Sequence, residues 1–228
     1  MNRTAEHALL ALLEDAGVAQ ALTAPLSRYG ALVLEANRRV NLTGAKSPEA
    51  LARHLLDSLT VVPHIREPYV DVGSGAGLPG IAVAIASGIP VTLIEATAKK
   101  AAFLTQTLEA LNLPGSVIQQ RAEEAGHDDA LRERFASGTA RALAGVTTVA
   151  ELLLPLILPG GVAVLQRGRF DEREHRSLED ASLMLGGRIE SELPLAGERR
   201  ILLVRKEGAT PLRFPRRAGI PEKRPLCT

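Results

Sequence analysis

The sequence predicts an α/β fold: a doubly wound, mostly parallel sheet of seven strands with an N-terminal helical cap. Two observations predict it. From residue 69 onward, short apolar segments alternate with segments of helical periodicity, joined by short connections. A glycine-rich stretch, residues 73–80, follows the first apolar segment and precedes an Ala/Ile/Val-rich one. This order is typical of an open sheet with a ligand site at the carboxyl ends of its strands.

The first 66 residues predict helices and no strand. Apolar residues at helical spacing indicate helices over about 4–16, 25–40 and 47–62. The third has Ser47 as its N-cap and Pro48 at its first position, where a missing N–H costs nothing. We therefore assign residues 1–66 to the helical cap.

The following segment, residues 67–206, predicts the sheet. Strands are expected at 69–73, 90–95, 115–120, 137–141, 162–165, 188–193 and 200–206, and helices at 79–87, 98–111, 122–133, 145–157 and 171–185. A hairpin-like turn at 197–200 makes the last strand antiparallel. Residues 207–228 then form a basic tail rich in Pro and Arg.

The glycine-rich stretch is the strongest functional signal. Gly73, Gly75, Gly77 and Gly80 allow positive φ and let a ligand lie against bare backbone. The N-terminus of the next helix offers unpaired N–H groups to a negatively charged group. Glu95 ends the following predicted strand, where it can accept hydrogen bonds from a ribose diol. These features predict a nucleoside-containing ligand.

Two ligands fit this pattern. The later glycines and the acid about 20 residues downstream match the dinucleotide fingerprint of NAD(P)-dependent oxidoreductases. However, Asp71 precedes the loop and Gly73 extends it, which gives the Asp-x-Gly-x-Gly-x-Gly pattern of S-adenosylmethionine-dependent methyltransferases. We favour S-adenosylmethionine over NAD(P), and both over a glycine turn that binds nothing.

Composition argues against a disulfide-stabilised, metal-binding, secreted or membrane-spanning protein. Hydrophobic residues make up 46% of the chain and Trp is absent, so the core must be aliphatic. The single Cys227 permits no internal disulfide, and the histidines lack metal-ligand spacing, so we expect no metal. The first residues include Glu6 and no long apolar core, and no apolar run approaches membrane-spanning length. We expect a soluble, cytoplasmic protein.

Charge is distributed unevenly along the chain. Residues 205–228 carry seven cations and two acids, a net of +5, whereas residues 1–204 carry 20 cations and 24 acids, a net of −4. This asymmetry indicates a polyanionic partner near the C-terminus. A solvated terminal tail is the alternative.

Several separated stretches resemble one family, the bacterial small-subunit ribosomal RNA guanine-N7 methyltransferases (RsmG, or GidB). The Gly-Leu-Pro-Gly loop at 77–80 and the Pro-Arg-Arg tail at 215–217 are specific to it. One departure is Gln166-Arg167-Gly168, where the family usually has Lys-Gly. The matching stretches are 37–43, 53–59, 71–80, 95 with 99–104, 121–124, 140–143 and 215–226.

The resemblance implies a Rossmann-like class I methyltransferase fold, S-adenosylmethionine as cofactor, and 16S ribosomal RNA or the small ribosomal subunit as partner of a monomeric enzyme. His54 and Asp57 would brace the cap against the catalytic domain or the RNA. Arg141 would also position the substrate or donor. The donor-binding residues predicted from the loop and the resemblance are Gly73, Ser74, Gly75, Gly77, Leu78, Glu95, Ala122, Glu123 and Arg141. The RNA-binding residues predicted from the cations of the tail and after the fifth strand are Arg167, Arg213, Arg216, Arg217, Lys223 and Arg224.

The implied reaction needs no general base, because guanine N7 presents a lone pair and loses no proton on methylation. Two other classes stay open. An NAD(P)-dependent oxidoreductase would need a proton donor, yet neither Tyr29 nor Tyr69 is followed four residues later by a lysine. A non-catalytic RNA- or nucleotide-binding module would leave the intact loop and Glu95 unexplained.

Overall fold

The computed structural model describes residues 3–141 and 145–227. Cα packing divides the chain into two compact units: the first joins Met1–Pro63 to Ser74–Gln119, and the second joins His64–Gly73 to Gln120–Thr228. The sequence predicted a cap (1–66), a sheet domain (67–206) and a tail (207–228), each continuous in sequence. The two compact units instead each join separate ranges of the chain. Ala142 and Leu143, part of one family-like stretch, lie outside the described residues, as do residues 1, 2 and 228.

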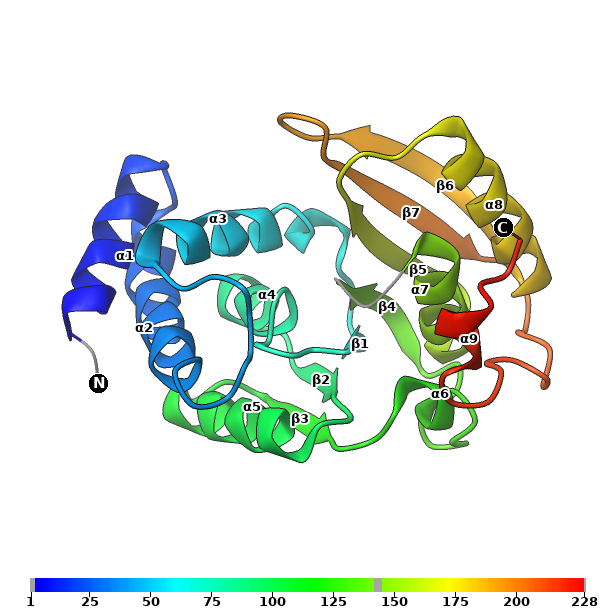
Figure 1. The fold of residues 1–228 in the computed structure, drawn as a ribbon, viewed down its shortest axis with the longest axis horizontal. Coiled ribbons are helices and arrows are strands. Elements are labelled where there is room, and N and C mark those ends of the chain that lie inside the picture. The colour runs from blue at the N-terminus through cyan, green and yellow to red at the C-terminus, as the bar shows by residue number, and fades with distance from the viewer. Residues whose placement is uncertain (1–2, 142–144, 228) are drawn as a thin grey trace. The chain divides into compact units, whose positions relative to one another are not determined.

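The N-terminal helices of the first unit pack on one another through leucines. They are α1 (Arg3–Asp15), α2 (Gln20–Ala36) and α3 (Pro48–Leu59), drawn in blue to cyan in Figure 1. Leu9, Leu26, Leu51 and Leu55 are fully buried. Each buried leucine contributes about 1.5–3 kcal/mol of hydrophobic stabilisation, so these contacts hold the cap together. The predicted N-terminal helices are confirmed.

The ends of α2 differ from the prediction for local reasons. The helix begins at Gln20 rather than near Pro25, so Pro25 lies in its second turn. It stops at Ala36 because the side chain of Asn37 bonds the following loop: Oδ1 accepts from the N–H of Leu42, and Nδ2 donates to the carbonyl of Thr43. An asparagine that bonds nearby backbone competes with helix continuation in this way.

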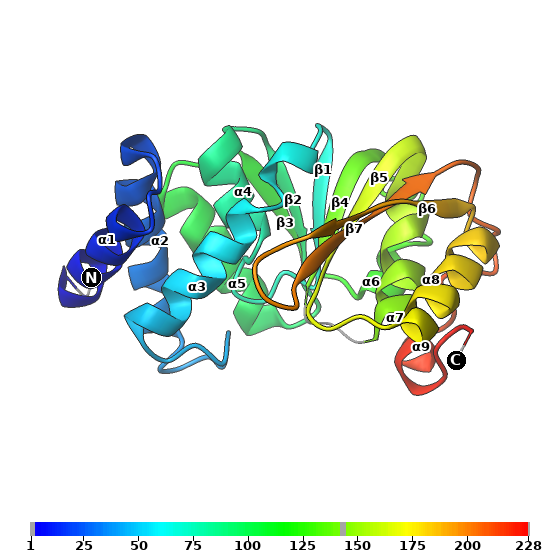
Figure 2. The same ribbon diagram turned by 90° about the horizontal axis from the view of Figure 1, so that it is seen from above.

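The rest of the first unit contains α4 (Gly80–Ser87), β2 (Val91–Ile94), α5 (Ala98–Ala110) and β3 (Gly115–Ile118). β2 pairs in parallel with β3, as the predicted βα alternation requires. Figure 2 shows these strands beside α4 and α5.

The second unit holds the remaining strands. β1 (Tyr69–Val72) and β5 (Ile157–Arg167) both pair in parallel with β4 (Phe135–Ala140). β7 (Arg200–Lys206) pairs antiparallel with both β5 and β6 (Gly187–Pro194). The order of the seven strands is β3-β2-β1-β4-β5-β7-β6. The predicted seven-stranded, mostly parallel sheet with an antiparallel last strand is confirmed.

Helices of the second unit cover this part of the sheet. α7 (Val146–Leu153) packs on β4, β5 and α8 (Glu172–Met184), and α8 also packs on β6. Figures 1 and 2 both show α7 and α8 side by side. The shorter helices are η1 (Val62–His64), which ends where this unit begins, α6 (Ala122–Ala125), η2 (Leu154–Leu156) and α9 (Ile220–Lys223).

Three predicted boundaries in the second unit are wrong. The helix expected over 122–133 is the single turn α6. The helix expected over 145–157 ends at Leu153 and passes into η2, because Pro155 has no N–H to continue it. β5 therefore starts at Ile157, five residues before the expected strand. The basic tail also contains a short helix, α9, with Pro221 in its first turn.

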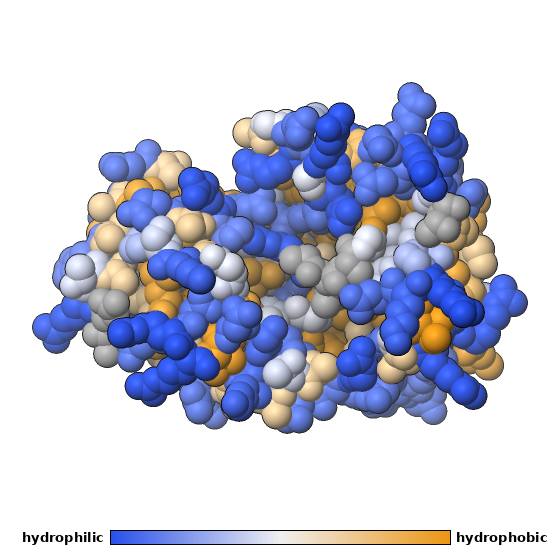
Figure 3. Space-filling view, in the orientation of Figure 1, coloured by the Kyte–Doolittle hydropathy of each residue, from blue (hydrophilic) through white to orange (hydrophobic). Residues whose placement is uncertain are grey.

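Hydrophilic side chains predominate on the face shown in Figure 3, with smaller hydrophobic patches between them. Within residues 3–141 and 145–227, no helix is both long and apolar enough to cross a membrane.

Candidate functional site

The glycine loop of the first unit is held by hydrogen bonds from both sides. The N–H of Ser74 donates to the carbonyl of Ile94 at the end of β2 (3.1 Å). The hydroxyl of Tyr29 in α2 donates to the carbonyl of Ala76 (2.8 Å). Gly77 has φ +89°, and a Cβ there would lie 2.6 Å from Cδ1 of Ile81, so only glycine fits. The loop is thus a rigid feature of the first unit.

Glu95 lies directly against this loop. Its side chain is 6% exposed; Oε2 accepts from the N–H of Gly75 (2.9 Å) and Oε1 accepts from the N–H of Thr97 (2.8 Å). Each carboxylate oxygen can accept more than one hydrogen bond, so both retain capacity for the hydroxyls of a ribose. The structure therefore brings two of the predicted donor-binding residues, Gly75 and Glu95, into direct contact.

The acid that precedes the loop belongs to a buried hydrogen-bonded chain in the second unit. Thr139 Oγ1 donates to Asp71 Oδ1 (2.7 Å) and lies 2.6 Å from the Tyr69 hydroxyl, which must then donate to it. Burial, and secondarily the charge of Asp71, raises the pKa of Tyr69 well above its ordinary value, so the phenol stays neutral. Sequence reasoning missed Tyr69 and Thr139, because their contact depends on the pairing of β1 with β4.

Glu123 lies in α6 with its carboxylate turned to the C-terminal segment, which we define as residues 207–227. Oε1 accepts from the N–H of Gly219 (2.8 Å) and from Nη2 of Arg121 (3.3 Å). Burial alone raises the pKa of Glu123, but the bond from Gly219, followed by smaller contributions that include Arg121, outweighs it and the pKa is lowered. The neighbouring Ala122 is half-buried. Donor contacts by Ala122 and Glu123 stay a prediction.

Comparison with known proteins decides the family. The family model described as GidB, rRNA small subunit methyltransferase G, matches residues 22–202. The chain is 41% identical to the ribosomal RNA small subunit methyltransferase G of Rubrobacter xylanophilus, over 86% of this chain and 81% of that protein. It is 34% identical to the protein of the same name from Leuconostoc citreum, over 97% and 99%.

The chain belongs to the GidB family. It is therefore an rRNA methyltransferase that uses S-adenosylmethionine, as the sequence predicted. Its fold is also similar to a solved structure of a MtNAS variant in complex with S-adenosylmethionine, with a TM-score of 0.53 and 20% identity over 86% of this chain and 81% of that one.

Two predicted site residues of this GidB protein, Arg141 and Arg167, lie at the carboxyl ends of strands in the second unit. Arg141 comes directly after β4 and is half-buried. Arg167 ends β5, and its Nη2 pairs with Oε1 of Glu174 in α8 (3.4 Å). This pairing gives Arg167 a structural partner within the Gln166-Arg167-Gly168 stretch, and its predicted RNA contact stays a prediction. His54 and Asp57 both lie in α3, and their predicted bracing role stays a prediction.

The C-terminal cations of this family member divide into two kinds. Arg216 donates from Nε and Nη2 to the carboxylate of Glu151 in α7 (2.8 and 2.6 Å), and Glu151 is fully buried. The hydrogen bond to Glu151, helped by the negative charge of that carboxylate, raises the pKa of Arg216. Arg216 therefore holds the C-terminal segment on the fold, and its predicted contact with RNA stays a prediction. The cations that stay exposed are Arg213, Arg217, Lys223 and Arg224.

Two further cations that sequence reasoning missed also hold this segment. The guanidinium of Arg132 donates to the carbonyls of Thr210 (2.6 Å) and Phe214 (2.9 Å). Nζ of the fully buried Lys206 donates to Thr210 Oγ1 (2.7 Å) and Glu133 Oε1 (3.1 Å). Burial lowers the pKa of Lys206, although Glu133 opposes this. Nothing in the local sequence distinguishes these two cations from solvated ones.

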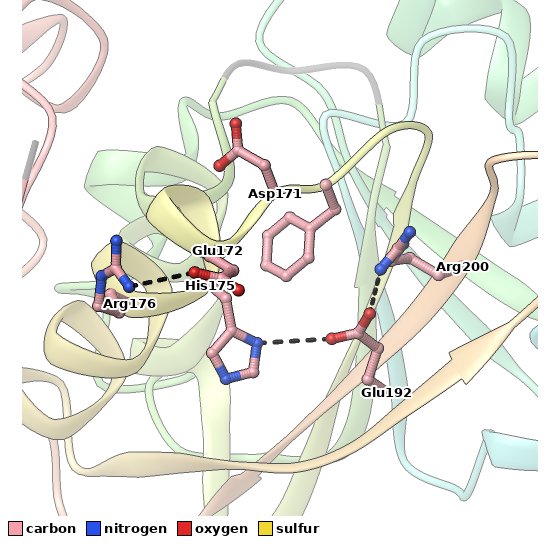
Figure 4. A pocket seen from close by; sticks show the side chains of 7 residues that line it. Asp171, Glu172, His175, Arg176, Glu192 and Arg200 are labelled. Atoms are coloured by element: carbon pink, nitrogen blue, oxygen red, sulfur yellow. Dashed lines mark hydrogen bonds and ion pairs between the residues drawn. The ribbon is translucent and has the colours of Figure 1, made fainter.

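A separate small cavity of about 250 Å³ lies beside α8 and β6. Figure 4 shows the carboxylate of Glu192 between His175 and Arg200: it forms an ion pair with Arg200 and lies 3.4 Å from Nδ1 of His175. The guanidinium of Arg200 lies 5.9 Å from the centre of the Phe170 ring. These polar groups bond one another and join the β6–β7 hairpin to α8. Within residues 3–141 and 145–227, no cluster of three His, Cys, Asp or Glu side chains could hold a metal ion.

Proposed function

We propose that this methyltransferase transfers the methyl group of S-adenosylmethionine to N7 of a guanine in 16S ribosomal RNA. The contact between the Gly75 N–H and Glu95 is the observation that carries the proposal, because it sets the carboxylate that we assign to the ribose hydroxyls against the loop that we assign to the donor. The resemblance of the 71–80 loop and the 215–217 tail to guanine-N7 methyltransferases supports the choice of base.

We assign the donor to the backbone of Gly73, Ser74, Gly75, Gly77 and Leu78, with Glu95 on the ribose hydroxyls. Ala122, Glu123 and Arg141 are the further contacts that we propose. The loop geometry supports this assignment: Gly75 and Gly77 have φ of +55° and +89°, a backbone conformation that glycine adopts readily and other residues rarely do.

The mechanism rests on position rather than on proton transfer. Guanine N7 offers its lone pair without losing a proton, and the positive charge moves from the sulfonium to the base. The carboxylates of Glu95 and Glu123 accept hydrogen bonds from backbone N–H groups, and Asp71 accepts one from Thr139, which fits orienting roles better than that of a base. Holding N7 in line with the methyl group can lower the barrier by about 7–11 kcal/mol.

The test is to incubate the protein with labelled S-adenosylmethionine and 16S ribosomal RNA, either naked or in the small subunit, and to map the methylated base. We expect label at N7 of one guanine, detected as strand cleavage at that base after reduction and aniline treatment. Label at another atom of the base, or on the ribose, would contradict the N7 assignment while leaving the family intact.

A further inference from the structure

A cavity of about 680 Å³ lies in the second unit between α6 and the C-terminal segment. Its lining combines three kinds of side chain: exposed apolar, cationic and acidic. The residues that matter are Leu212, Arg213, Arg217, Glu124, His127 and Asp128. We propose that this cavity binds an unpaired base of the RNA substrate, with guanine preferred. This inference rests on the proposed function, because it concerns the same RNA.

The walls of the cavity are tied to each other, so the site exists before a ligand arrives. Nε2 of His127 lies 2.7 Å from the carbonyl of Pro215, and the N–H of Gly219 donates to Glu123. Arg132 adds a hydrogen bond to the carbonyl of Phe214. A site held in this way loses little conformational entropy on binding, which favours affinity.

Leu212 supplies an apolar surface at the mouth of the cavity. It is 82% exposed, the largest exposed fraction among the bulky apolar side chains of the described residues. Such a side chain is stabilised when a flat, apolar ligand face covers it. Unpaired RNA bases present faces of this kind, and proteins that read single-stranded RNA take up splayed bases.

The charges around Leu212 match the two parts of a nucleotide. Arg213 and Arg217 are exposed and can bind phosphate oxygens through their planar guanidinium groups. Glu124 and Asp128 can accept hydrogen bonds from the Watson–Crick edge of a base. Asp128 already accepts one bond from the N–H of Ala130 through Oδ1 and keeps further acceptor capacity.

The acids decide which base is preferred. Carboxylates repel phosphates, so a surface that bound RNA only through charge would gain nothing from Glu124 and Asp128. Guanine presents N1–H and a 2-amino group side by side, which is the donor pair that a carboxylate can accept; uracil presents a single donor there. The combination of arginines with acids therefore indicates base recognition rather than general attraction for a polyanion.

The test relies on a variant for which charge attraction and base recognition predict opposite changes in RNA affinity. The double variant Glu124→Gln with Asp128→Asn removes two negative charges, so a purely electrostatic surface would bind RNA more tightly. Base recognition predicts the reverse: about 5- to 100-fold weaker binding of a short single-stranded RNA of alternating uridine and guanosine. Inosine lacks the 2-amino group, so wild-type protein should bind the uridine–inosine RNA less tightly, and the double variant should show a smaller difference between the two RNAs.

Matched controls come from α8. Glu179→Gln with Asp180→Asn makes the same chemical change at exposed positions outside the cavity and should leave RNA affinity unchanged or slightly raised. Leu212→Ser should weaken RNA binding and leave its salt dependence unchanged. Leu183→Ser changes another exposed leucine, outside the cavity, and should leave RNA binding unchanged.

The proposal is wrong if the Glu124/Asp128 double variant binds the uridine–guanosine RNA as tightly as wild-type protein, or more tightly. It is also wrong if the double variant loses the same factor in affinity for the uridine–guanosine and uridine–inosine RNAs. Methylation of guanine N7 by wild-type protein is measured separately. If the wild type methylates N7 but the cavity variants bind RNA normally, only this inference fails; if N7 is not the target, the proposed function fails.

Discussion

At the scale of single residues, function depends on backbone groups whose positions neighbouring side chains fix. Glu95 accepts from the N–H of Gly75, so the donor loop and the proposed ribose ligand are positioned by one carboxylate. Gly75 itself has φ +55°, a conformation that a β-branched residue adopts only with strain. Changes at this glycine should therefore affect the donor before they affect the fold.

We expect Gly75→Val to abolish donor binding, because the added side chain fills the space beside the backbone where the ligand lies. In wild-type protein, S-adenosylmethionine at about 100 times its Kd should raise the free energy of unfolding by about 2.7 kcal/mol, and NAD should not. In a thermal melt, the Gly75→Val variant should not be stabilised by S-adenosylmethionine. Gly17→Val is the control, since Gly17 has φ +75° with no atom within 4 Å of a Cβ. A normal donor response in Gly75→Val would disprove the placement of the site.

Arg216 and Arg217 are adjacent but should behave differently. Arg216→Ala leaves the fully buried Glu151 without its cation, which should cost about 3 kcal/mol of stability. Arg217→Ala removes an exposed charge and should change stability by less than about 0.5 kcal/mol. Urea unfolding of both variants measures the difference. Equal stabilities would mean that the pairing with Glu151 contributes nothing in solution.

At the scale of elements, the C-terminal segment is part of the fold rather than a solvated tail. Its Phe214, Pro221 and Leu226 are buried, and its backbone receives hydrogen bonds from Arg132 and gives them to Glu123 and Glu133. The segment predicted to engage a polyanionic partner thus has two sides: one packs on the fold, and the other carries the exposed cations.

Acid should loosen this segment. Glu123 and Glu133 have pKa values below the ordinary 4.5, because bonds from Gly219 and Thr210 outweigh the effect of burial. The unfolded chain therefore binds more protons than the folded one near and below pH 4.5, so their stabilising effect is complete above that pH and is lost as pH falls through the folded values. Urea unfolding at about pH 7 and about pH 3.5 measures the loss. Replacing both glutamates by Gln should make the decline smaller; an unchanged decline would assign it to other carboxyls.

At the scale of the whole molecule, we propose that the uneven distribution of charge attracts RNA. The exposed cations of the C-terminal segment belong to a region of net +5 in a chain whose other residues carry net −4. Contacts with phosphate produce affinity that falls with salt, whereas contacts with a base do not. The two kinds of contact can therefore be separated by experiment.

Replacing Arg213, Arg217, Lys223 and Arg224 by Ala should weaken RNA binding and flatten its log–log salt dependence by up to about 3, since each phosphate contact on a single strand contributes about 0.7. Donor binding should stay the same, because the 71–80 loop is untouched. Binding measured across a salt series gives the slope. A well-folded variant with an unchanged slope would remove these cations from RNA recognition.

The order of strands and helices, and the contact surface of the glycine loop with Glu95 after the second strand, could be predicted from the sequence. These follow from signals within a short window: apolar periodicity, glycines in succession and an acid at a strand end. Element boundaries were wrong where a single residue decided them, as at Asn37 and Pro155. Which partners the buried cations bind follows from the tertiary structure alone. Arg216 bonds Glu151 and Arg132 bonds Phe214 across 65 and 82 residues of chain, and such partners leave no local pattern. A cation that holds the fold and one that faces solvent look alike in sequence, because burial depends on the packing of distant segments.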